Sequence, residues 1–100
     1  MDNFGLPSQT LTKLIDVFQQ PPEIEKIMLY GSRAKGNYRI GSDIDLCVYA
    51  STWDTDQLFR LEQQLDDLDL PYKIDLCLHH QIDNPSLIDH IQRVGIQIFP

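Results

Sequence analysis

The chain has few basic residues and no long apolar segment. Eight Lys and Arg stand against fifteen Asp and Glu, which gives a formal net charge of −7. Such an acidic balance opposes broad contact with nucleic-acid phosphates, so we expect no direct nucleic-acid partner and no template-directed polymerase. No stretch reaches the roughly 18 to 20 apolar residues of a membrane span, and the first residues lack the basic and apolar regions of a signal peptide. We therefore expect a cytoplasmic protein without a membrane partner.

Cysteine is scarce as well. The two cysteines, Cys47 and Cys77, are too few for a disulfide framework and lack the neighbouring ligands of a structural zinc site. We interpret both as small buried residues. His79 and His80 form another pair, but no third nitrogen or sulfur ligand follows at a suitable spacing. We expect both histidines in a loop.

The 100 residues are expected to form one domain, residues 1–100, with a proper core but no room for a second lobe. Apolar spacing predicts a helix capped by Ser8, a long helix after Asp54 or Thr55, and a last helix with Asn84 as cap and Pro85 at its first position. The expected strands are residues 27–30, 43–49, 72–79 and 96–99. This order predicts an α/β fold with a mixed sheet of about four strands flanked by helices.

A glycine-serine turn follows the first expected strand. The strand breaks at Gly31 and Ser32, where a short segment of helical character begins. Such a break leaves unpaired amides that, with the Ser32 hydroxyl, can hold phosphate oxygens. Glycine at position 31 lets a ligand come close. The turn therefore predicts a phosphate-binding site.

Three aspartates form the second signal. Strand alternation puts Asp43 and Asp45 on one face, where two carboxylates can share magnesium ions. Asp75 lies in a matching setting, because the run Ile-Asp-Leu-Cys at residues 74–77 repeats the run at 44–47. If the two strands are neighbours in register, Asp75 lies about 4.8 Å across from Asp45. We expect the three acids at the entrance of the two strands.

These residues resemble a known signature. The pattern of Gly31-Ser32, ten intervening residues, Asp43-x-Asp45 and a downstream Asp75 on a strand is similar to that of the polymerase-beta-like nucleotidyltransferases. The form GSRAKGNYRIGSDIDL especially resembles the minimal (MNT-type) nucleotidyltransferases, small domains commonly paired with HEPN-domain toxins. The resemblance covers nearly the whole chain.

The resemblance implies a function and a set of site residues. It implies an antitoxin that transfers AMP from ATP to a protein hydroxyl, a tyrosine of a cognate HEPN toxin. Asp43, Asp45 and Asp75 would be catalytic and would bind two Mg²⁺ ions, while Gly31, Ser32 and Arg33 would bind the nucleotide. Two alternatives remain open: transfer to a small hydroxylated molecule, and a non-catalytic antitoxin that neutralises by binding alone.

Further cations lie between the turn and the acids. Arg33, Lys35 and Arg39 could neutralise charge on the phosphates during transfer. A solvated surface charge is an equally good interpretation of each one taken singly. Tyr38 could stack on a base or cover the core, and the sequence does not choose between the two.

Overall fold

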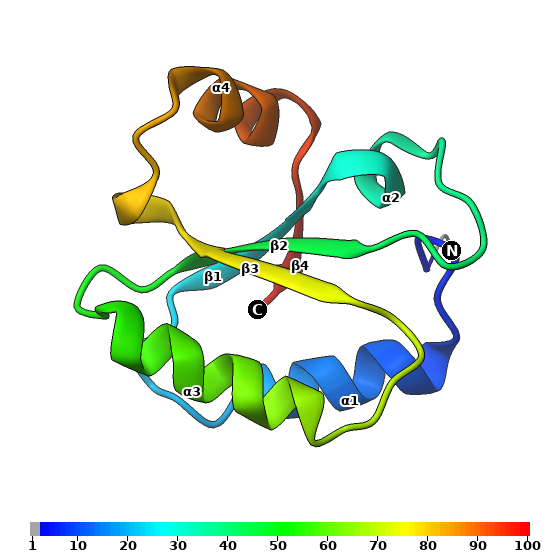
Figure 1. Cartoon of the computed structure of the whole chain (residues 1–100), viewed down its shortest axis with the longest axis horizontal. Helices are drawn as coiled ribbons and strands as arrows, with labels where there is room; N and C mark the ends of the chain where they lie inside the picture. The colour runs from blue at the N-terminus through cyan, green and yellow to red at the C-terminus, as the bar shows by residue number, and fades with distance from the viewer. Residues whose placement is uncertain (1–2) are drawn as a thin grey trace.

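The computed structural model describes residues 3–100 and contains one four-stranded sheet (Figure 1). The strands are β1 (Lys26–Tyr30), β2 (Ile44–Tyr49), β3 (Ile74–Leu78) and β4 (Ile96–Phe99), in the spatial order β3-β2-β1-β4. Strand β1 is antiparallel to β2 and β4, whereas β2 and β3 are parallel. The predicted mixed sheet is therefore confirmed.

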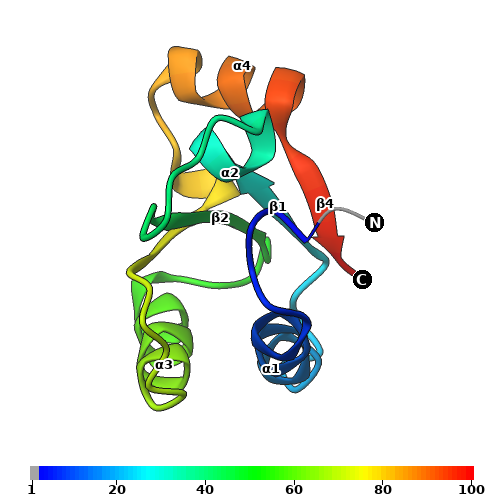
Figure 2. The same cartoon turned by 90° about the vertical axis from the view of Figure 1, so that its right-hand side faces the viewer.

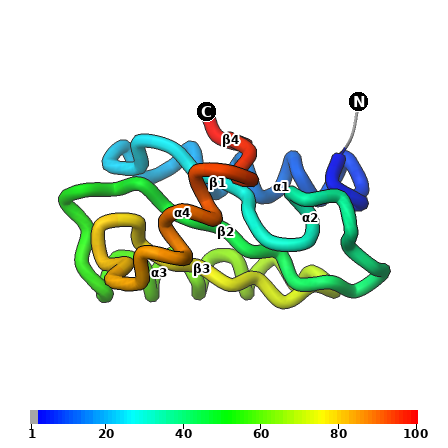
Figure 3. Tube along the Cα trace, turned by 90° about the horizontal axis from the view of Figure 1, so that it is seen from above, coloured from blue at the N-terminus to red at the C-terminus, as the bar shows by residue number. Residues whose placement is uncertain are grey.

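The helices cover the two faces of the sheet in pairs. Helices α1 (Ser8–Phe18) and α3 (Thr55–Asp66) lie side by side on one face, and α2 (Gly31–Lys35) and α4 (Pro85–Val94) lie on the other (Figure 2). A single turn of 3₁₀ helix, η1 (His79–Gln81), follows β3. Seen from above, α4 passes over β1 (Figure 3). Within residues 3–100, no helix has the length and apolar character needed to cross a membrane.

The hydrophobic core lies between the sheet and the α1–α3 face. Leu14 and Phe18 of α1 and Leu61 of α3 are almost completely buried there, and the sheet contributes alternate residues of its two central strands: Ile27, Leu29, Ile44, Leu46 and Val48. Each such side chain contributes about 1.5 to 3 kcal/mol by leaving water. Because side chains alternate along a strand, burial of this set directs the intervening residues toward α2 and α4.

The predicted capping residues are confirmed at α3 and α4 and wrong at α1. Asp54 caps α3 in a capping box, since its carboxylate accepts from the Asp56 N–H and the Gln57 side chain accepts from the Asp54 N–H, both at 2.9 Å. Asn84 caps α4 with Pro85 at the first position, as predicted. The predicted Ser8 cap is wrong.

At that position the N-cap residue is Pro7, and Ser8 is already the first residue of α1. The Ser8 hydroxyl instead accepts a hydrogen bond from the Asn3 amide at 3.0 Å. Proline fixes its own φ near the value that leads into a helix, so the chain enters α1 without a side-chain cap.

The parallel pairing of β2 with β3 aligns two pairs of polar side chains. Asp45 is paired with Asp75, and Cys47 with Cys77, in one register. Cys47 is fully buried, as predicted, whereas Cys77 is only partly buried, and both are free thiols. The sheet therefore presents an acid pair, followed by a thiol pair, to the α4 side.

Candidate active site

The Gly31-Ser32 turn lies directly against Asp45. Tyr30, the last residue of β1, pairs with Asp45 of β2, so the next residue begins beside the carboxylate. Gly31 has a φ of +74°, and a Cβ added there would collide with Asp45 Oδ2. Glycine is thus needed for both backbone conformation and space. The structure therefore brings the turn and Asp45, two parts of the predicted site, into direct contact.

The Gly31 N–H and the Ser32 hydroxyl, two hydrogen-bond donors of this turn, differ in their hydrogen bonding. The Gly31 N–H donates to Nε2 of His90 on α4 at 3.2 Å. Ser32 is half-buried, and its hydroxyl has no hydrogen-bond partner among residues 3–100. The hydroxyl is therefore available to a ligand, whereas the glycine amide already has an acceptor.

Asp45 is held in an environment that opposes its negative charge. Its pKa is raised above the ordinary value by partial burial, by the charges of Asp75 and Asp43, and by a side-chain hydrogen bond to Asp75; nearby His90 acts weakly in the opposite direction. Asp43 immediately precedes β2 and is exposed. Acids that repel in this way stabilise a bound cation, which removes the repulsion.

The donor set fits a hard divalent ion. Carboxylate oxygens are the ligands that Mg²⁺ and similar ions take in proteins. Asp45 and Asp75 face one another, but within residues 3–100 no three Asp, Glu, His or Cys side chains are already arranged around one point. The predicted participation of Asp43 in metal binding stays a prediction.

A tyrosine forms the wall beside the acids. The Tyr30 hydroxyl lies 3.7 Å from Cys77 Sγ, and its ring meets His90 edge to face with centroids 6.0 Å apart. Burial, first of all, raises the pKa of Tyr30, and the hydrogen bond to Cys77 adds to the effect. The phenol therefore stays neutral and has a structural role, in contact with Cys77 and His90.

Arg33 holds the backbone instead of facing water. Its side chain is 2% exposed. Nε and Nη2 donate to the Ser42 carbonyl at 3.2 and 2.8 Å, and Nη1 donates to the Phe4 carbonyl at 2.8 Å. The rings of Tyr38 and Tyr72 lie 5.4 and 5.1 Å from the guanidinium. The solvated-surface interpretation of Arg33 is therefore wrong.

The direct role predicted for Arg33, nucleotide binding, stays a prediction. Its observed contacts fix Ser42, the residue before Asp43, through charge-assisted hydrogen bonds. The aromatic contact also gives Tyr38 a place against this guanidinium. Lys35 and Arg39 are exposed, and the Arg39 N–H donates to the Ser42 hydroxyl at 2.8 Å.

Sequence reasoning missed His90 and Lys73. Lys73 Nζ lies 3.9 Å from Asp75 Oδ1, with both side chains substantially exposed. Lys73 lies two residues before Asp75, and side chains two residues apart on a strand lie on the same face. The sequence could therefore have indicated that Lys73 lies near Asp75. His90 carries no such signal, since it is 59 residues from Gly31 and meets it only through the packing of α4.

The other two histidines take no part in this site. His79 stacks on Tyr49 with centroids 4.1 Å apart, and His80 Nε2 lies 2.8 Å from the Trp53 carbonyl oxygen. They form η1 at the end of β3, a single 3₁₀ turn where we expected an irregular loop. Packing and backbone bonding explain both residues.

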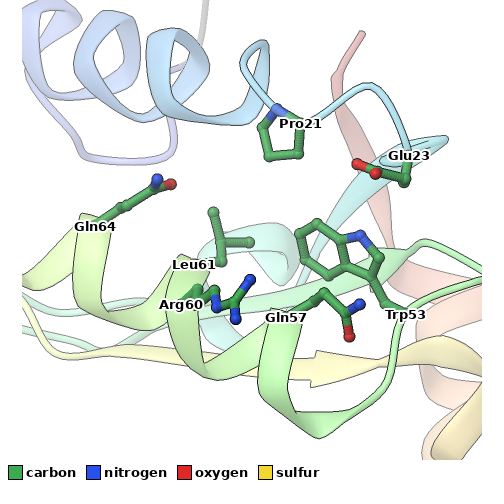
Figure 4. Close-up of a pocket in the computed structure, with 7 residues that line it drawn as sticks. All are labelled: Pro21, Glu23, Trp53, Gln57, Arg60, Leu61 and Gln64. Atoms are coloured by element: carbon green, nitrogen blue, oxygen red, sulfur yellow. The ribbon is translucent and has the colours of Figure 1, made fainter.

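A separate pocket of about 260 Å³ lies away from the acids. Trp53, Gln57 and Arg60 line it together with the segment that joins α1 to β1 (Figure 4). None of the three aspartates contributes to it. It lies between the α1–β1 connection and α3, on the core side of the sheet, so it is not the predicted site.

Known proteins are similar to this chain along most of its length. The family model described as "Polymerase beta, Nucleotidyltransferase" matches residues 12–100 of the chain. A curated protein of Methanocaldococcus jannaschii, named as a candidate protein adenylyltransferase, is 32% identical over 83 residues, which are 82% of this chain and 84% of that protein.

Solved structures of MNT antitoxins are similar along most of the chain. A chain of a toxin–antitoxin complex with AMP-PNP is 28% identical with a TM-score of 0.69, covering 93% of this chain and 73% of that chain. A chain from the complex of a tri-AMPylated Shewanella oneidensis HEPN toxin with an MNT antitoxin is 26% identical with a TM-score of 0.66, covering 90% and 69%. On the family match and the curated relative, this chain belongs to the polymerase beta nucleotidyltransferase family.

Proposed function

We propose that the chain is an adenylyltransferase that moves AMP from ATP to a hydroxyl of a partner HEPN toxin and thereby acts as its antitoxin. One observation carries the proposal: the Gly31-Ser32 turn meets the Asp45–Asp75 pair so closely that only glycine fits between them. A phosphate held at the turn would lie beside the acids. The relatives named for protein adenylylation and for an AMPylated toxin support the same reaction.

Each residue of the site has a separate role in the proposed reaction. The Ser32 hydroxyl and the turn amides bind the phosphates, and the oxygen of the acceptor attacks the α-phosphorus while pyrophosphate leaves. Asp75 takes the proton of the acceptor hydroxyl. Asp43, Asp45 and Asp75 would hold two Mg²⁺ ions. Bound there, the ions would neutralise charge on the phosphates. Arg33 contributes through the loop that it fixes in front of Asp43.

The acceptor is proposed to be a tyrosine of the toxin. The acids lie on a partly open face of the sheet, where Asp43 and Lys73 are exposed, so a protein surface can reach them. The net charge of −7 suits a basic partner. Attraction between opposite charges would speed encounter at low salt and would be screened at high salt.

Co-expression with the neighbouring gene product tests the proposal. We expect intact-mass spectrometry to find one or more AMP units on the toxin with the wild-type chain and none with Asp43→Asn. A matched control is Asp67→Asn, which removes an exposed acid beyond the end of α3 and should leave the modification unchanged.

Two outcomes would replace the proposal. An unmodified toxin that both the wild type and Asp43→Asn neutralise fully would establish an antitoxin that acts by binding alone. Modification of a small hydroxylated molecule, with the toxin left untouched, would establish the other enzyme.

A further inference from the structure

His90 projects from α4 onto the phosphate-binding turn and has no part in the proposed transfer reaction. Its Nε2 accepts the Gly31 N–H at 3.2 Å. Its ring meets Tyr30 edge to face, with an interplanar angle of 82°. Tyr30 and Gly31 are consecutive, so the imidazole is held at two points over the junction of β1 and α2. The position of this half-buried ring is therefore fixed by specific contacts.

The hydrogen bond from the Gly31 N–H defines which tautomer the neutral His90 imidazole adopts. A ring nitrogen that accepts an N–H carries no proton, so the proton of neutral His90 is on Nδ1. The Gly31 N–H has a single hydrogen. It cannot donate well to Nε2 and to a phosphate oxygen at the same time, so occupation of this amide by one acceptor excludes the other.

We propose that His90 is a displaceable substitute for a phosphate oxygen on the Gly31 amide. The inference rests on the proposed function, which places phosphate at Gly31-Ser32. Without nucleotide, Nε2 satisfies an amide that would otherwise lose hydrogen bonding at a half-buried turn. With nucleotide, a phosphate oxygen takes the amide and the imidazole moves aside.

This exchange lowers the affinity of the site for phosphorylated ligands and leaves its affinity for nucleosides unchanged. A nucleoside brings no oxygen anion to the turn, so it leaves the His90 contact in place. A nucleotide must break that contact, and its measured affinity is lowered accordingly. His90 is thus a specificity-determining residue that acts against binding.

Calorimetric titration of the full chain with α,β-methylene-ATP and Mg²⁺ tests this. A net hydrogen bond contributes about 0.5 to 1.5 kcal/mol, so His90→Ala should bind the analogue about two- to tenfold more tightly than the wild type. Gln92→Ala, an exposed position on the same helix, should leave the affinity unchanged. Adenosine should not distinguish His90→Ala from the wild type.

Nitrogen NMR of the histidine rings gives a second, direct readout. In the wild type the Nε2 resonance of His90 should shift when the analogue is added, because the Gly31 N–H leaves it, and adenosine should cause no such shift. Thermal unfolding of both variants checks that each is folded.

Failure of this inference can be distinguished from failure of the proposed function. A wild type that binds no analogue would overturn both this inference and the proposed function. Binding by the wild type with an unmoved Nε2 resonance and an unchanged affinity in His90→Ala would overturn this inference alone. Weaker binding by His90→Ala would make His90 a nucleotide ligand and would also overturn displacement.

Discussion

Asp45 on β2 and Asp75 on β3 are paired across two parallel strands, and both side chains are partly buried. Two carboxyl groups this close oppose each other's ionisation. The metal-free fold therefore carries a repulsion that a cation would relieve, and that repulsion governs how variants of the acids should behave.

Asp45→Asn should abolish nucleotide transfer without unfolding the protein. The amide cannot replace a carboxylate as a ligand of Mg²⁺, but it removes charge repulsion from the metal-free site. The melting temperature in excess chelator should therefore equal or exceed that of the wild type. Asp67→Asn serves as the control with normal transfer. Substantial transfer by folded Asp45→Asn would count decisively against this site.

The raised pKa of Asp45 makes its own contribution to stability depend on pH. The folded state holds this proton more tightly than the unfolded state, in which Asp titrates near 3.8. The resulting stabilisation is complete below that value and is lost as pH rises through the raised folded-state pKa. The free energy of unfolding of the metal-free wild type, minus that of Asp45→Asn, should fall over this interval and then level off. Urea titrations across pH with chelator measure it, and a difference that rises with pH would contradict the assignment.

Ser32→Ala should slow transfer about 10²- to 10³-fold, the loss typical of removing a donor to developing charge. The hydroxyl has no partner within residues 3–100, so its removal should cost little stability. Single-turnover rates with labelled ATP measure the effect. If the variant keeps both full rate and full ATP affinity, Ser32 has no role in phosphate binding.

Arg33→Met should destabilise the fold by about 2 to 5 kcal/mol, because it leaves the Ser42 and Phe4 carbonyls without their charged donor. Arg33→Lys keeps the charge but cannot reach both carbonyls in fork geometry, so it should recover only part of the loss. Urea denaturation compares the two. Equal stability of wild type and Arg33→Met would show that the guanidinium contacts are unimportant.

Strand patterns carried most of the predicted architecture. The repeat of Ile-Asp-Leu-Cys anticipated the register of Asp45 with Asp75, because equal patterns on parallel neighbours align when one face is buried. The Gly31-Ser32 turn was also readable, since glycine after an apolar strand marks a change of direction. These features depend on residues close in sequence.

The contacts of Arg33 and His90 could not be read in the same way. The sequence indicated either a nucleotide-binding cation or a surface charge for Arg33, and only the fold brings the Phe4 and Ser42 carbonyls to it. His90 reaches Gly31 through the placement of α4 over β1. The same limit applied to the start of α1, where Pro7 and not Ser8 occupies the cap position.

The fit of Gly31 against Asp45 predicts that Gly31→Ala will lose about 100-fold in transfer rate. Alanine at a φ of +74° is strained, and its Cβ must push the Asp45 carboxylate away from its position. A displacement of about 1 Å in a reacting site can cost this much. Single-turnover rates at saturating ATP measure it.

Gly36→Ala is the matched control, because Gly36 has a φ of +87° but open space around its Cβ position. Both variants bear a backbone cost of about 1 to 2 kcal/mol in stability, so their melting temperatures should fall together. Only Gly31→Ala also moves a carboxylate, so only Gly31→Ala should lose transfer. Equal activity of the two folded variants would show that the contact between the turn and Asp45 does not matter for the reaction.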